Sequence, residues 1–110
     1  MGITMSPEDI FNYAKNEAEK AAVMARLKGH EDAYCGFAWV KITPARGKFV
    51  NYLKSNNIGR NGIYGGWEVS SNVFNPHNTQ SLTFKEVISS AFANALNEHG
   101  IRAYVQTRSD

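Results

Sequence analysis

The apolar residues of this chain switch repeatedly between the spacing of a helix and the spacing of a strand. Helical spacing suits three segments, and three others have the length, composition or alternation of strands. We expect helices at 6–29, 43–56 and 81–100, and strands at 34–42, 67–70 and 102–108. An α-β-α-β-α-β order over 110 residues predicts one domain spanning 1–110, of α+β or small α/β class, with three or four strands covered by helices.

Local signals fix several of these boundaries. Ser6-Pro7 is typical of a helix start, and an apolar stripe made mostly of alanine follows it. Thr43-Pro44 repeats that start signal before the second helix. The third helix begins either at Ser81 or at Thr83, and Gly100 ends it. Asn61-Gly62 predicts a tight turn with positive φ before the strand at 67–70.

Composition and charge narrow the classes of protein to which the chain belongs. An apolar fraction of 43% and a charged fraction of 20% are typical of a soluble globular protein. The sequence has no signal-peptide pattern and no apolar run of the roughly 18 residues that a membrane span needs, so we expect no membrane association and a cytoplasmic location. A single cysteine, Cys35, excludes an intrachain disulfide and a cysteine-based zinc cluster. A domain this small buries a limited core, which favours a homodimer.

The stretch "CGFAWVKI", Cys35 to Ile42, gives the most specific functional hypothesis in the sequence. It partly matches the octapeptide of RNA-recognition domains, because Gly36, Phe37, Ala38 and Val40 fit that motif and Trp39 is aromatic. Its two ends fail, since the motif has a basic residue first and an aromatic residue last. An RNA-recognition domain also begins with a strand, for which residues 1–5 are too short and too polar. On a strand, Phe37 and Trp39 would share one face.

Two interpretations of these rings stay open. In the first, Phe37 and Trp39 pack under a helix or against a second subunit, as aromatic residues of central strands commonly do. In the second, they bind single-stranded nucleic acid together with the cations of 34–66, a segment with five basic residues and no acidic one. The candidate nucleic-acid-binding residues are Phe37, Trp39, Lys41, Arg46, Lys48, Lys54 and Arg60.

A glycine-rich segment offers a third interpretation, which is binding of a small ligand or a nucleotide. Two adjacent glycines between Tyr64 and Trp67 would let a ligand or another backbone approach closely, although a simple bend explains them equally well. The candidate ligand-binding residues are Arg60, Asn61, Tyr64, Gly65, Gly66, Trp67 and His77.

Evidence for catalysis is sparse. Cys35 and His77 could form a nucleophile and base pair only if the fold brought them together, and a cysteine on an apolar strand is usually inert packing. His30-Glu31-Asp32 are adjacent, whereas metal ligands usually come from separate elements. We therefore expect no enzyme activity, no catalytic residue, no metal site and no cofactor.

Four stretches together resemble small uncharacterised proteins of tailed bacteriophages. They are "CGFAWVKI", "IYGGWEV", "QS" followed by a helix with "AFANAL", and "GIRAYVQTRSD". The resemblance covers about Cys35 to Asp110 and departs from the pattern at Ser109, where an apolar residue is usual. It implies a phage or prophage origin and an accessory role in the host cell or the virion. These proteins have no known function, so the resemblance assigns no catalytic or binding residue to this chain. With the missing catalytic set, it favours a non-catalytic binding module.

Overall fold

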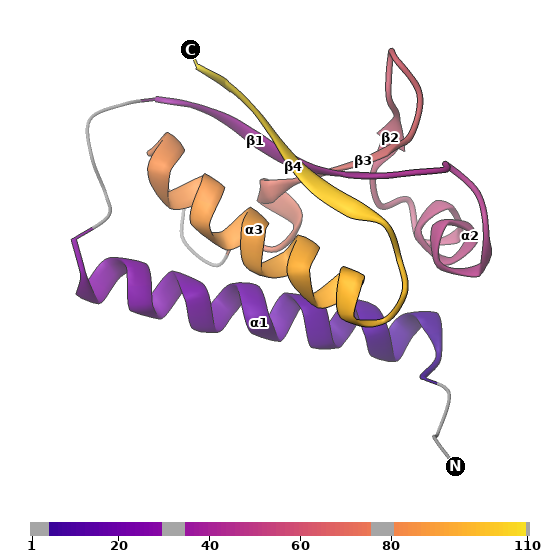
Figure 1. Ribbon diagram of the computed structural model, residues 1–110, viewed down its shortest axis with the longest axis horizontal. Helices are drawn as coiled ribbons and strands as arrows, with labels where there is room; N and C mark the ends of the chain where they lie inside the picture. The colour runs from indigo at the N-terminus through magenta and orange to yellow at the C-terminus, as the bar shows by residue number, and fades with distance from the viewer. Residues whose placement is uncertain (1–4, 30–34, 76–80, 110) are drawn as a thin grey trace.

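The computed structural model describes residues 5–29, 35–75 and 81–109 (Figure 1). Helices and strands follow one another as α1 (Pro7–Leu27), β1 (Gly36–Ile42), α2 (Lys48–Ser55), β2 (Arg60–Asn61), β3 (Trp67–Ser70), the short 3₁₀ helix η1 (Ser71–Val73), α3 (Leu82–Glu98) and β4 (Ala103–Ser109). The sheet has four strands in the order β2-β3-β1-β4, and all neighbours are antiparallel. The α+β class and the strand number are therefore confirmed, with the two-residue β2 as the strand that the sequence pattern missed.

The central strands of the sheet are β3 and β1. Strand β1 pairs with β3 along Trp39↔Ser70 and Lys41↔Glu68, and it pairs with β4 over its whole length. From β1 onward the order is β-α-β-β-α-β, with α1 added in front. The octapeptide thus lies on β1, which is the first strand along the chain and has a neighbouring strand on each side in the sheet.

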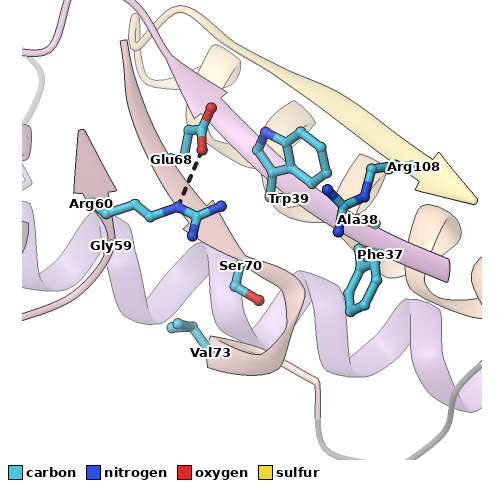
Figure 2. A pocket seen from close by; sticks show the side chains of 9 residues that line it. All are labelled: Phe37, Ala38, Trp39, Gly59, Arg60, Glu68, Ser70, Val73 and Arg108. Atoms are coloured by element: carbon cyan, nitrogen blue, oxygen red, sulfur yellow. Dashed lines mark hydrogen bonds and ion pairs between the residues drawn. The ribbon is translucent and has the colours of Figure 1, made fainter. Parts of the chain in front are cut away.

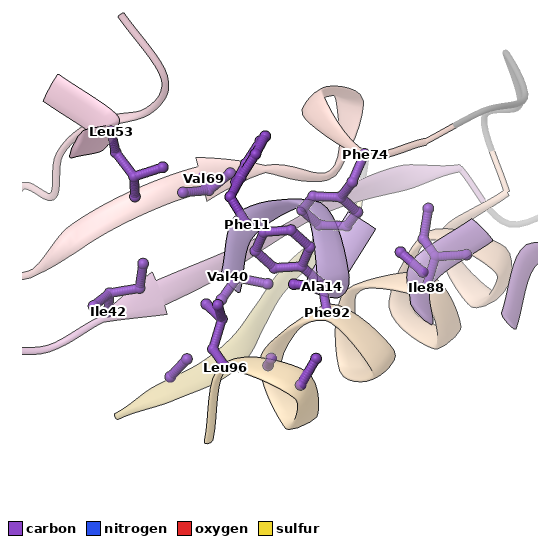
Figure 3. Close-up of a cluster of buried hydrophobic side chains, with 14 of the residues drawn as sticks. Phe11, Ala14, Val40, Ile42, Leu53, Val69, Phe74, Ile88, Phe92 and Leu96 are labelled. Atoms are coloured by element: carbon purple, nitrogen blue, oxygen red, sulfur yellow. The ribbon is translucent and has the colours of Figure 1, made fainter. Parts of the chain in front are cut away.

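The helices lie on one side of the sheet, as Figure 1 shows. Alternate residues of β1 (Ala38, Val40 and Ile42) are buried on that side, as is Val69 of β3. Phe92 of α3 lies at the centre of this core (Figure 3), stacked on Phe74 with ring centroids 4.2 Å apart. The described segments leave the opposite side of the sheet uncovered; we call it the open face.

The alanine stripe brings α1 close to α3. Ala14, Ala18, Ala22 and Ala25 are all buried, and α1 meets α3 along most of its length. The small alanine side chains permit this close approach. Phe11, at the start of the stripe, is the large apolar side chain of this face, and its ring lies edge-on to that of Phe92 with the ring centroids 6.0 Å apart. Helix α1 therefore covers α3 and forms the outer part of the helical layer.

The helix starts are fixed by side-chain caps at α1 and α3. Ser6 accepts a hydrogen bond from the Asp9 amide at 3.1 Å, which confirms the predicted first cap. Of the two predicted starts for α3, the Ser81 start is confirmed, because its hydroxyl accepts from the Phe84 amide at 3.2 Å. Gly100 ends this helix at φ 79°, and the Ile101 amide returns to the Leu96 carbonyl at 3.1 Å.

Two local predictions are wrong. Helix α2 begins at Lys48 and not after Thr43-Pro44, because the Thr43 amide donates to the Arg102 carbonyl at 3.1 Å and is held beside β4. The predicted tight turn at Asn61-Gly62 is a wider turn, closed by the Gly62 amide on the Gly66 carbonyl at 2.9 Å. Positive φ values occur at Gly65 and Gly66 instead.

A hydrogen bond between Tyr13 and Glu98 joins α1 to α3 and gives a pH-dependent prediction. The Tyr13 hydroxyl donates to Glu98 Oε1 at 2.6 Å, which raises the pKa of Tyr13 from 10.0 to about 12, with desolvation adding to the effect. The folded chain holds this proton more tightly than the unfolded chain does. The stabilisation should therefore be complete below pH ~10 and disappear as pH rises through about 12.

Urea unfolding of the wild type and of Tyr13→Phe, measured at intervals from pH 8 to 12, tests this prediction. The wild type should be the more stable protein by a constant margin up to about pH 10, and the margin should then shrink. A margin that grows above pH 10 would contradict the assignment.

Candidate functional site

The open face carries a cleft of about 440 Å³ that extends from the β2 edge across β3 and β1 to β4 (Figure 2). Residues from all four strands and from η1 form its walls, together with Gly59, the residue before β2. The lining residues are Phe37, Ala38, Trp39, Gly59, Arg60, Glu68, Ser70, Val73 and Arg108. A volume of this size is within the usual range for small-molecule sites.

The two aromatic rings of β1 lie on this face. The predicted alternation is confirmed, because Ala38, Val40 and Ile42 are buried beneath the helices while Phe37 is 43% exposed and Trp39 is half-buried. The prediction that both rings pack under a helix is therefore wrong, whereas their packing against a second subunit stays a prediction. The helices pack against the face of β1 that presents Ala38, Val40 and Ile42. The rings of Phe37 and Trp39 point to the opposite face.

Neighbouring strands hold both rings in place. The Trp39 indole Nε1 donates to Gln106 Oε1 of β4 at 2.9 Å, and the two residues are register partners. The Phe37 ring has the Arg108 guanidinium carbon 5.1 Å from its centroid, within the range of a cation–π contact. Lys85 Nζ of α3 lies 5.5 Å from the same centroid and donates to the Gly36 carbonyl at 2.8 Å. The cleft thus presents an oriented indole beside an exposed phenyl ring.

Charged groups stand on both sides of these rings. Figure 2 shows Arg60 reaching in from β2 and Arg108 reaching in from β4, with Trp39 between them. Arg60 Nε donates to Glu68 Oε1 at 3.3 Å; the Arg60 side chain is 77% exposed, whereas that of Glu68 is only 11% exposed. Ser70 and Val73 complete the wall below Trp39. The arrangement can stack flat rings and attract anions.

The structure divides the predicted nucleic-acid-binding residues into three groups. Phe37, Trp39 and Arg60 line the cleft. Lys41 shares their face but is 6% exposed, because the backbone at Gly66 covers its side chain. The remaining three cations lie in or just before α2, outside the cleft; they are Arg46, Lys48 and Lys54. Lys54 is placed over the Trp67 ring, 5.3 Å from its centroid.

The predicted ligand-binding residues of the glycine-rich segment do not surround one cavity. Of the described members of that set, Arg60 alone lines the cleft. Trp67 is buried on the helical side, where its indole donates to the Ile58 carbonyl at 2.9 Å. Asn61, Gly65 and Gly66 belong to the β2–β3 hairpin, and Tyr64 near its tip is 93% exposed. His77 lies outside the described residues, as do His30, Glu31 and Asp32.

Sequence reasoning missed Arg108, Glu68, Ser70 and Val73. In the strand predicted at 102–108, alternate residues put Tyr104, Gln106 and Arg108 on one face, but only the β1–β4 register brings Arg108 opposite Phe37. The described residues include no group of three side chains suited to hold a metal ion. Cys35 is exposed just before β1.

No protein-family model, curated protein or solved structure matches the chain. The resemblance to phage proteins therefore stays a prediction. Among the described segments, no helix is both long enough and apolar enough to cross a membrane.

Proposed function

We propose that this protein binds single-stranded nucleic acid on the open face of its sheet, with bases stacked on Phe37 and Trp39. The observation that carries the proposal is the position of these two rings, side by side on an uncovered central strand and flanked by Arg60 and Arg108. Every base has a π-face, so aromatic rings bind bases with little dependence on sequence, while the arginines attract phosphate.

The architecture supports this interpretation. A four-stranded sheet that is covered by helices on one side and presents aromatic side chains on the other is how RNA-recognition domains stack two or three bases. In this chain the partial octapeptide lies on β1, the first strand of the sheet. Its neighbour β3 presents Glu68 and Ser70 in place of aromatic residues. The stacking surface therefore does not extend onto β3.

The proposal keeps the expectation of a non-catalytic binding module. The resemblance favours a phage-encoded accessory protein of the host cell or the virion, and it does not indicate which ligand is bound. A homodimer that covers the same rings is the competing occupant of the open face, because exposed aromatic residues also favour self-association.

Fluorescence anisotropy with a labelled ten-nucleotide single strand tests the proposal. Phe37→Ala should weaken binding about tenfold, since stacking of one base on an aromatic ring contributes ~1–3 kcal/mol. Arg108→Gln should weaken binding and lower the dependence of log Kd on log salt by about one unit. Quenching of Trp39 fluorescence should accompany binding, whereas Trp67 is buried on the other side of the sheet.

Arg46→Gln is the matched control, because it removes the same charge from outside the cleft. It should leave the affinity within about twofold once salt is held constant. Binding that weakens equally in Arg46→Gln and Arg108→Gln would indicate attraction to the whole basic chain and not to the cleft. No binding at low salt, together with sedimentation at twice 12.2 kDa, would replace the proposal by self-association.

A further inference from the structure

We infer that Glu68 makes the cleft select bases that carry an exocyclic amino group, so that cytosine is bound more tightly than thymine or uracil. The inference rests on the proposed function. Glu68 is the one acidic side chain among the described residues that line the cleft, and it lies in a wall that otherwise attracts anions. A carboxylate there opposes phosphate binding, so its contribution must come through a different contact.

The Glu68 side chain is only 11% exposed, and it lines the cleft, so a ligand would reach its carboxylate from the cleft. Arg60 Nε donates to Oε1 at 3.3 Å, which is a long hydrogen bond. Oε2 lies close to the backbone of the β2–β3 hairpin, since a Cβ at Gly62 would be only 2.8 Å from that oxygen. A carboxylate offers about four acceptor positions, more than this single contact uses.

The position of Glu68 relative to the rings supports contact with a base edge. Glu68 and Trp39 lie on the same face of adjacent strands, two residues apart in register, because Trp39 pairs with Ser70. Figure 2 shows the Glu68 carboxylate beside the Trp39 indole on the wall that includes Arg60. A base stacked in the cleft would therefore turn its edge towards Glu68.

The chemistry of the base edge then decides the preference. An ionised carboxylate only accepts hydrogen bonds. The cytosine N4 amino group donates, so it can pair with Glu68, and glutamate is a known partner of this group. Thymine and uracil present a carbonyl oxygen at the same position, which the carboxylate repels. We expect a preference of about tenfold for cytosine.

The test compares (dC)10 with (dT)10 at constant salt and pH 7.5, for the wild type and for Glu68→Gln. The wild type should bind (dC)10 about tenfold more tightly. Glutamine has a similar shape and can both accept and donate. The variant should therefore bind (dC)10 more weakly and (dT)10 more tightly, and the ratio should fall towards one.

Affinity changes of opposite sign for (dC)10 and (dT)10 distinguish direct recognition of the base by Glu68 from a role of Glu68 in positioning Arg60. If Glu68 only orients Arg60, the substitution will change both affinities by the same factor, and the inference is overturned. Glu86→Gln, an exposed change on α3 with the same loss of charge, should leave the ratio unchanged. Should the variant fail to fold, a wild-type titration with an oligomer of 2-pyrimidinone, which lacks the amino group, tests the base side of the contact: it should bind more weakly than (dC)10, and equal binding overturns the inference.

The outcomes also separate this inference from the proposed function. Equal binding of (dC)10 and (dT)10 by the wild type overturns the base preference and leaves single-strand binding intact. Binding of neither oligomer overturns both. A tenfold preference that survives in Glu68→Gln assigns the discrimination to another group and overturns the role of Glu68.

Discussion

Phe92→Ala is expected to lower the free energy of unfolding by ~3–5 kcal/mol, a large fraction of the stability of a domain this size. Phe92 is fully buried and joins three elements, since its ring stacks on Phe74 after η1 and meets Phe11 of α1 edge-on. Its truncation removes both ring contacts and leaves a cavity between the sheet and α1. Urea unfolding followed by far-UV circular dichroism measures the change.

Phe37→Ala is the matched control for this prediction, because it truncates the same side chain on the opposite side of the sheet. Phe37 is 43% exposed, and its main contacts are with two cations. The loss should be about 1 kcal/mol or less. Equal destabilisation by the two substitutions would mean that the open face is covered in solution.

Gly59→Ala is expected to lower the free energy of unfolding by ~2–4 kcal/mol, the second-largest effect. Gly59 has φ +89°, and a Cβ at this position would collide with the Trp67 indole nitrogen and lie 2.6 Å from the Glu68 carbonyl. The carbonyl belongs to β3 and cannot move without disturbing the sheet. The substitution therefore combines backbone strain with a steric clash.

Gly65→Ala separates the two contributions. Gly65 has a similar φ of +94°, but a Cβ there would have no neighbour within 4 Å. It should cost only the backbone strain, ~1–2 kcal/mol. Thermal or urea unfolding of both variants gives the comparison, and a Gly65→Ala loss as large as that of Gly59→Ala would show that strain alone dominates.

Much of the fold could be predicted because its signals are local. The Ser6 cap, the alanine stripe and the Gly100 stop depend on residues a few positions apart, and each is present in the structure. Thr43-Pro44 failed as a helix start for a non-local reason, since pairing with the Arg102 carbonyl holds Thr43 beside β4. A short-range signal there was overridden by a contact between segments far apart in the sequence.

The candidate site was only partly predictable for the same reason. Alternation along 35–42 gave the shared face of Phe37 and Trp39, but it could not tell which face the helices would cover. Proximity in sequence also grouped Arg46, Lys48 and Lys54 with the rings, whereas α2 carries them away from the cleft. Arg108 joins Phe37 across more than seventy residues of sequence, through the β1–β4 register.

The sequence by itself determined the three helices, the three longer strands, most of their ends and the class of the domain, because helix and strand periods, caps and glycine stops act over a few residues. Only the tertiary structure decided the strand order, the side of the sheet that stays open and the meeting of Phe37, Trp39, Glu68, Arg60 and Arg108 in one cleft. These depend on which strands pair and where the helices pack, and both are set by contacts between distant parts of the chain.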